Sequence, residues 1–138
     1  MNCKVIDNYL EEDIFQSVET YIKDIIQWEV AYKLNDAADK EEQFQFFRRI
    51  IEQDEIRYPE DMFIVEKVLK PLFHGDAEVC VRRARVNMFV RTSSFPVEMG
   101  YHEDWDTPGV YSLLLYNEDS DGATQFKDGE KILSKRNR

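Results

Sequence analysis

The sequence predicts an α+β fold, with helices in the first half of the chain and antiparallel strands in the second. Two observations lead to this expectation. Apolar residues recur at helical spacing before residue 75, and they alternate with polar residues after it. The chain has 138 residues, of which 43% are apolar and 13% aromatic. We therefore expect one domain, 1–138, with a mainly helical part at 1–75 and strands at 76–138.

The first half contains three predicted helices after a short strand at 3–10. Residues 11–28 place apolar side chains such as Phe15, Val18 and Ile22 on one helical face, with acidic residues in the first turn. The phenylalanines and isoleucines of residues 44–51 share that spacing and predict a second helix. Pro59 is suited to begin a third helix, and Pro71 is expected to stop it.

The second half is expected to form a series of strands. Hydrophobic and polar residues alternate in 85–91, which predicts a strand. The segment "GVYSLLLYN", 109–117, is apolar on both faces and predicts a buried strand. Two further strands, "ATQFKDG" and "EKILSKRNR", are expected to join as a hairpin at Asp128-Gly129, a common turn pair.

Charge and cysteine content exclude several classes of function. The net charge of −10 argues against nucleic acid or an anionic membrane surface as a partner, since both require a basic face. The two cysteines, Cys3 and Cys80, lie far apart and form no CxxC pair. Charged residues interrupt the N-terminal segment, and no apolar run is long enough to span a bilayer. These features favour a cytoplasmic protein.

The segment "GYHEDWD", 100–106, contains a candidate metal site. In an extended chain the side chains of His102 and Asp104 project to the same side, so an imidazole nitrogen and a carboxylate oxygen can chelate one ion. This mixed donor set suits Fe(II), and also Mn, Co, Ni or Zn. Taken without its surroundings, the pair fits an ordinary surface loop better than a metal site.

The order of motifs around this pair resembles the Fe(II)/2-oxoglutarate-dependent dioxygenases, in their prolyl-4-hydroxylase-like branch with phage and marine microbial members. His102-x-Asp104 is followed by "YSLLLYN", "GATQF" and "EKILSKRNR". Upstream, "RARVNMFVRT" is similar to the strand that precedes the metal motif in that family, and "VIDNYLEEDIFQSVETYI" to its N-terminal entry. The resemblance covers most of the chain, and its specific motifs lie in residues 82–138.

The resemblance implies a double-stranded β-helix, a cupin-like jelly roll, of which this chain would form the N-terminal part. It implies an oxygenase that uses Fe(II) and 2-oxoglutarate to hydroxylate a C–H bond of a peptidyl or small-molecule substrate, releasing succinate. His102 and Asp104 would be metal ligands. Asn87, Thr124 and Phe126 would lie near the cofactor, although ordinary sheet positions explain these three residues equally well. The substrate itself is not encoded in these motifs.

Two departures from the family pattern bear on activity. The second histidine and the 2-oxoglutarate-binding arginine of the family follow the strand at which this sequence ends, and His74, upstream of the strands, is expected to be a loop residue. The tyrosine that many members carry before the strand-ending asparagine is Leu115 here, and Tyr116 is expected on the opposite face. We therefore expect a truncated chain that is inactive alone and forms a homodimer through its open sheet edge.

Two other classes of function stay open. The chain could be a non-enzymatic jelly-roll module for binding or assembly. It could also bind a cation through its acidic loop, because "NEDSDGATQFKD" nearly matches an EF-hand calcium loop. The matching positions are Asn117, Asp119, Asp121 and Gly122, and Asp128 stands where the loop requires a glutamate. An EF-hand needs flanking helices, whereas the flanks here are strand-like, which favours an ordinary turn.

Overall fold

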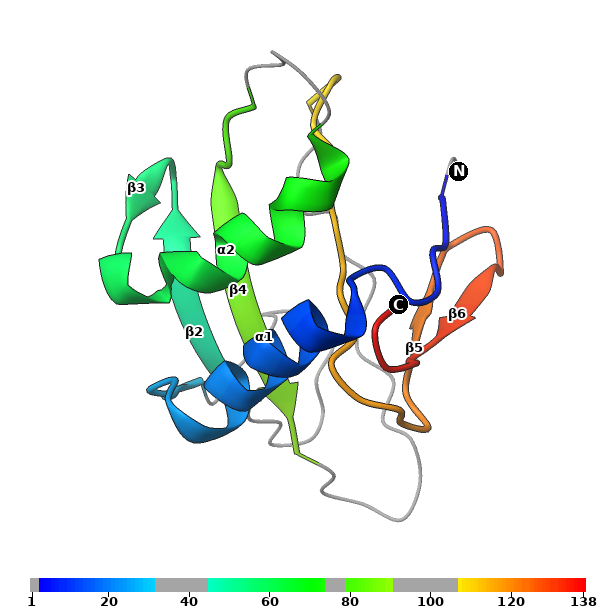
Figure 1. Cartoon of the computed structure of the whole chain (residues 1–138). Helices are drawn as coiled ribbons and strands as arrows, with labels where there is room; N and C mark the ends of the chain where they lie inside the picture. The colour runs from blue at the N-terminus through cyan, green and yellow to red at the C-terminus, as the bar shows by residue number, and fades with distance from the viewer. Residues whose placement is uncertain (1–2, 32–44, 74–78, 91–106) are drawn as a thin grey trace. The chain divides into compact units, whose positions relative to one another are not determined.

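The computed structural model describes residues 3–31, 45–73, 79–90 and 107–138 (Figure 1). It contains helices and antiparallel sheets, so the α+β prediction is confirmed. The described residues form two compact units. The helix–sheet unit consists of residues 10–31, 45–73 and 79–90, and the hairpin unit consists of residues 3–9 and 107–138.

The sheet of the helix–sheet unit is built around β2 (Gln45–Glu52). β4 (Arg83–Phe89) pairs with β2 along its length, while β1 (Glu29–Ala31) and β3 (Glu55–Ile56) pair with its two ends. All these pairings are antiparallel. A two-residue turn joins β2 to β3, in which Gln53 and Asp54 have φ of 53° and 66°. Positive φ at both positions belongs to the turn type whose twist matches that of a hairpin.

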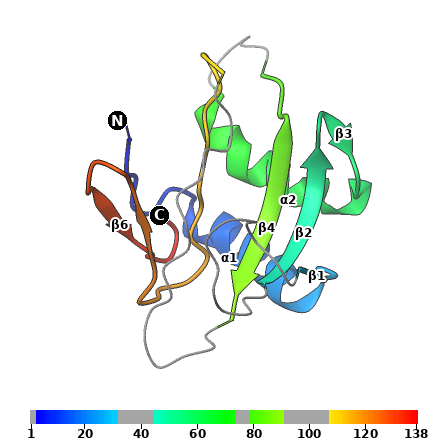
Figure 2. The same ribbon diagram turned by 180° about the vertical axis from the view of Figure 1, so that it is seen from behind.

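Two predicted helices are confirmed, and both cover the same face of this sheet (Figures 1 and 2). α1 (Glu12–Asp24) buries Phe15 and Val18, and α2 (Met62–Leu69) buries Ile64 and Val65. Pro59 occupies the first position of a short 3-10 helix, η1 (Pro59–Asp61), that leads into α2. A second 3-10 helix, η2 (Lys70–Leu72), contains the proline expected to stop α2.

The predicted helix over residues 44–51 is wrong, because its described residues, 45–51, belong to the central strand β2; Phe44 lies outside the described residues. The helical spacing of the apolar residues arises from a β-bulge. Arg49 pairs with Arg85 and Ile51 with Ala84, so Ile50 is an extra residue in the ladder. Ile50 and Ile51 are both buried, at 1% and 4% exposure. Apolar residues three and four positions apart imitate a helix, and in β2 the adjacent buried residues Ile50 and Ile51 coincide with the bulge.

A buried ion pair joins β2 to the start of α2. Arg48 Nε donates to Asp61 Oδ2 at 2.6 Å, and the two side chains are 5% and 2% exposed. The hydroxyl of Tyr21 on α1 lies 2.9 Å from Asp61 Oδ1 and 3.0 Å from the Glu60 carbonyl oxygen. The Arg48 guanidinium also stacks on the ring of Tyr58, 3.2 Å from its centroid. Helix and sheet are thereby linked by a polar contact within an apolar core.

The hairpin unit contains the predicted hairpin, with β5 (Ala123–Gln125) paired to β6 (Lys131–Leu133). Gly129 has φ of 91°, which favours glycine, and its N–H donates to the Phe126 carbonyl to close the turn. The segment 3–9 forms no strand, contrary to expectation. It is joined to the C-terminal residues instead, since Asp7 accepts hydrogen bonds from Arg138 at 2.6 and 3.1 Å.

The predicted buried strand at 109–117 is also wrong. Residues 110–116 form no ladder with another described segment, and Tyr111 is 93% exposed. Leu113 and Leu114 are exposed as well. The segment has the composition of a strand, but a strand requires a partner strand. Within 111–116, only Tyr116 forms backbone hydrogen bonds with another described segment, residues 137–138.

Candidate metal centre

The predicted ligands His102 and Asp104 lie outside the described residues, as does His74. Among residues 3–31, 45–73, 79–90 and 107–138, no three His, Cys, Asp or Glu side chains are grouped in a way that could hold a metal ion. The iron site thus stays a prediction from sequence. What the structure describes is the segment that follows it, 107–138.

Thr124 lies on β5 opposite Ile132 of β6 and is partly buried. Its Oγ1 atom is 2.6 Å from the hydroxyl oxygen of Tyr116, so the two residues share a hydrogen bond. The sequence did not predict this partner for Thr124, because the irregular turn between residues 117 and 122 hides their register. The position of Tyr116 is fixed from its backbone too: its N–H donates to the Arg138 carbonyl at 3.0 Å, and its carbonyl accepts from Asn137 N–H at 2.9 Å.

Phe126 follows β5 and forms the base of the hairpin turn. Its N–H donates to the Glu130 carbonyl at 2.8 Å, and its carbonyl accepts from Gly129. The side chain is partly buried. Because residues two apart on a strand share a face, Phe126 and Thr124 lie on the same side of the hairpin. A structural role in the turn accounts for the backbone contacts of Phe126.

Asn87 belongs to the other unit, where it lies on β4 opposite Phe47 of β2. Its side chain is exposed. Arg85, two residues away on the same face, forms a bidentate ion pair with Glu52 at 2.7 to 3.0 Å. Asn87 and Thr124 are therefore described in separate units, and the structure does not define one cofactor site containing both.

The acidic segment 117–128 contains an irregular turn, the strand β5 and the start of the hairpin turn. Asp119 Oδ1 accepts a hydrogen bond from the Arg136 N–H at 2.8 Å, and Asp128 Oδ1 accepts one from the Glu130 N–H at 3.1 Å. The latter bond lowers the pKa of Asp128. β5 lies within this segment, and the described residues that flank it, 107–116 and 129–138, contain no helix. The EF-hand likeness is thus confined to residue types.

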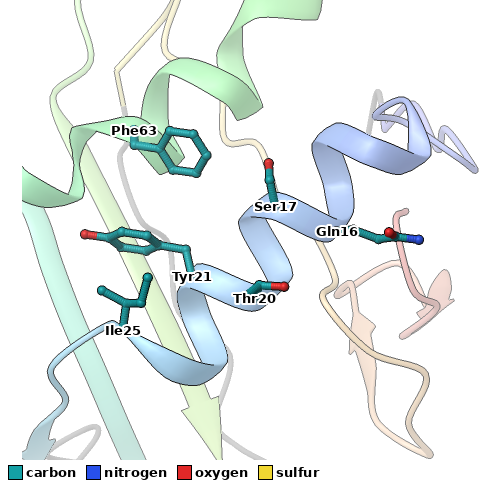
Figure 3. Close-up of a pocket in the computed structure, with 6 residues that line it drawn as sticks. All are labelled: Gln16, Ser17, Thr20, Tyr21, Ile25 and Phe63. Atoms are coloured by element: carbon teal, nitrogen blue, oxygen red, sulfur yellow. The ribbon is translucent and has the colours of Figure 1, made fainter.

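A shallow, largely apolar depression lies along α1 in the helix–sheet unit (Figure 3). The rings of Tyr21 and Phe63 lie side by side there, with centroids 5.7 Å apart. Its polar groups bond within the helix: Ser17 Oγ donates to the Ile14 carbonyl, and Gln16 donates to Glu12. With the Tyr21 hydroxyl turned toward Asp61, the depression presents no arrangement of nucleophile and base.

No helix in the described part of the chain is long and apolar enough to cross a membrane. No family model, curated protein or solved structure matches this chain significantly. The likeness to the dioxygenases is therefore carried by the motifs of residues 82–138 themselves.

Proposed function

We propose that this chain carries the first two iron ligands of an Fe(II)/2-oxoglutarate-dependent oxygenase and belongs to a jelly-roll fold. The observation that carries the proposal is the pairing of Tyr116 with Thr124. Tyr116 lies between the His-x-Asp and Gly-x-Thr-x-Phe motifs, and Thr124 lies in the second of them. Their hydroxyl oxygens lie 2.6 Å apart, although the strand predicted over 109–117 does not form. The β5–β6 hairpin begins within the Gly-x-Thr-x-Phe motif, and we propose it as part of that fold.

Each residue has a definite chemical task in this proposal. His102 supplies an imidazole nitrogen and Asp104 a carboxylate oxygen, two of the three ligands in a 2-His-1-carboxylate site. Leu115 stands where many family members carry their tyrosine, so this chain lacks that phenol. In its place, we propose the Tyr116–Thr124 pair, which has one hydroxyl hydrogen more than its mutual bond uses and can donate it to a carboxylate of 2-oxoglutarate. When bound, iron and 2-oxoglutarate supply the oxidation of a C–H bond.

No histidine follows His102 in this sequence, so residues 103–138 contain no second imidazole ligand. We propose that the chain by itself binds Fe(II) weakly and shows little turnover. Affinity at a two-ligand site falls short of a closed triad, and neither ligand can be lost without nearly abolishing it.

An anaerobic Fe(II) titration followed by calorimetry tests this proposal. His102→Ala and Asp104→Ala should each abolish binding, whereas Asp121→Ala, a matched removal of a carboxylate in the acidic loop, should leave it unchanged. Tyr116→Phe should leave Fe(II) binding intact and weaken the subsequent binding of 2-oxoglutarate. Binding that survives His102→Ala but is lost in Asp121→Ala would contradict the oxygenase proposal and favour a cation-binding loop.

The alternative is a non-enzymatic jelly-roll module for binding or assembly, and it predicts no specific Fe(II) binding in any variant.

A cytoplasmic location also belongs to the proposal. Both cysteines, Cys3 and Cys80, are exposed and unpaired by disulfides, which suits a reducing compartment. Nucleic acid and anionic membranes are not among the proposed partners, because the net charge is −10.

A further inference from the structure

The side chain of Arg138 joins the N-terminal segment to the hairpin. Its Nε and Nη2 atoms donate to the two carboxylate oxygens of Asp7 at 2.6 and 3.1 Å, and its Nη1 atom donates to the Leu133 carbonyl, at the end of β6, at 3.2 Å. The C-terminal end of the chain accordingly lies beside residues 7–9 (Figure 1). A two-pronged contact of this kind fixes the plane of a guanidinium as well as its position.

The backbone of the same C-terminal residues holds Tyr116. The Arg138 carbonyl accepts from the Tyr116 N–H at 3.0 Å, and the Asn137 N–H donates to the Tyr116 carbonyl at 2.9 Å. Asn137 is 2% exposed with φ of 57°, a conformation that asparagine adopts more readily than most residues. Its own carbonyl accepts from the Tyr9 N–H at 3.0 Å. The position of Tyr116 therefore depends on two C-terminal residues that the N-terminal segment holds in turn.

The hydrogen bond between the Tyr116 and Thr124 hydroxyls requires both of these connections. Thr124 is fixed by the pairing of β5 with β6, whereas Tyr116 belongs to neither strand. The two oxygens lie 2.6 Å apart, and a displacement of about 1 Å is enough to break an O–H···O hydrogen bond of this length. Because Arg138 contacts β6 through its side chain and Tyr116 through its backbone, it sets the distance between the two hydroxyls.

We infer that Asp7 is a positioning residue for the Tyr116–Thr124 pair and acts through Arg138. The Asp7 carboxylate holds the guanidinium against β6, and the Arg138 backbone holds Tyr116 at hydrogen-bonding distance from Thr124. The Asp7 side chain is 42% exposed, so its ion pair contributes little to stability by itself and its role is geometric. The consequence for ligand binding rests on the proposed function, in which this hydroxyl pair donates a hydrogen to a carboxylate of 2-oxoglutarate.

A double-mutant cycle in urea denaturation tests this inference without any ligand. Asp7→Asn removes the charge that orients Arg138, and Thr124→Val removes the hydrogen bond that this orientation supports. The double variant should lose less stability than the sum of the two single losses, because Asp7→Asn has already weakened the hydroxyl pair. Lys135→Met is the matched control. Lys135 is 51% exposed and contacts Asp7 at 3.4 Å, and its loss leaves the Asp7–Arg138 pair in place, so its effect should add to that of Thr124→Val.

Anaerobic calorimetry of 2-oxoglutarate binding at saturating Fe(II) gives a second readout. Asp7→Asn should weaken this binding about tenfold, the lower end of what one hydrogen bond to a charged group contributes, and leave the Fe(II) affinity unchanged. Asp7→Glu keeps the carboxylate and should restore most of the binding.

Additive losses in the cycle, or 2-oxoglutarate binding that Asp7→Asn and Lys135→Met affect equally, would overturn the inference. If the unmodified chain bound no 2-oxoglutarate, that result would instead contradict the proposed function, and the cycle would still decide the role of Asp7.

Discussion

Replacing Asp61 by Asn should destabilise the helix–sheet unit strongly, because it leaves the buried Arg48 guanidinium without its counter-charge. The pair is 2.6 Å apart with side chains 5% and 2% exposed. Burial alone would lower the pKa of Arg48, but the hydrogen bond and charge of Asp61 outweigh it and raise that pKa. At about 4 Å between charge centres and an effective dielectric constant of about 20, the attraction is about 4 kcal/mol.

In Asp61→Asn, Arg48 keeps a weaker attraction to a second carboxylate, that of Glu60. Glu60 Oε1 stays 3.1 Å from Arg48 Nη2, but the Glu60 side chain is 61% exposed, so its contribution is strongly screened. The Tyr21 hydroxyl can still donate to the Glu60 carbonyl. We therefore expect the free energy of unfolding to fall by about 3 kcal/mol, the lower end of the cost of stranding a buried charge.

Urea denaturation followed by circular dichroism at pH 7 measures this loss. Glu52→Gln is the matched control, because it removes the carboxylate from the Arg85–Glu52 pair, whose side chains are 34% and 22% exposed. That change should cost less than about 1 kcal/mol. The double variant Arg48→Met/Asp61→Leu should be more stable than Asp61→Asn, since no charge is then stranded. A loss in Asp61→Asn no larger than that in Glu52→Gln would refute the reasoning.

Three further predictions concern the hairpin unit. Thr124→Val removes the hydrogen bond to Tyr116 and should cost about 1 kcal/mol in urea denaturation. Gly129→Ala forces a side chain into a conformation with φ of 91° and should cost about 1–2 kcal/mol in the same assay. The hydrogen bond with Arg138 lowers the pKa of Asp7 below its ordinary value of 3.8, so the pair stabilises the fold above that pH and its contribution is lost as the pH falls through the lowered value. An NMR titration of Asp7 should show the lowered pKa, and a midpoint at or above 3.8 would contradict the pairing.

The helices were predictable because their signals are local. α1 carries acidic residues in its first turn and a continuous apolar face, and Pro59 marks the approach to α2. β2 was not predictable in the same way. Its bulge at Ile50 shifts the apolar pattern away from simple alternation, and the bulge depends on pairing with β4, more than thirty residues later in the chain.

The candidate site divides along the same line. The position of Thr124 on a hairpin strand could be predicted, because the turn pair Asp128-Gly129 is a local signal for the hairpin. Its partnership with Tyr116 depends on the irregular turn between them, for which residue types give no register. The strand predicted over 109–117 is wrong for a related reason. Its composition is that of a buried strand, but burial depends on partner segments as well as on the segment's own sequence.

The most direct test of the proposed function is to locate a bound divalent ion by NMR. Mn(II) suits the same nitrogen and oxygen donors as Fe(II), and its unpaired electrons broaden the resonances of nearby amides. The proposal predicts that substoichiometric Mn(II) broadens the amides around His102 and Asp104 first, and that His102→Ala removes the effect. Broadening that begins at Asp119 and Asp121 and is unchanged in His102→Ala would contradict it.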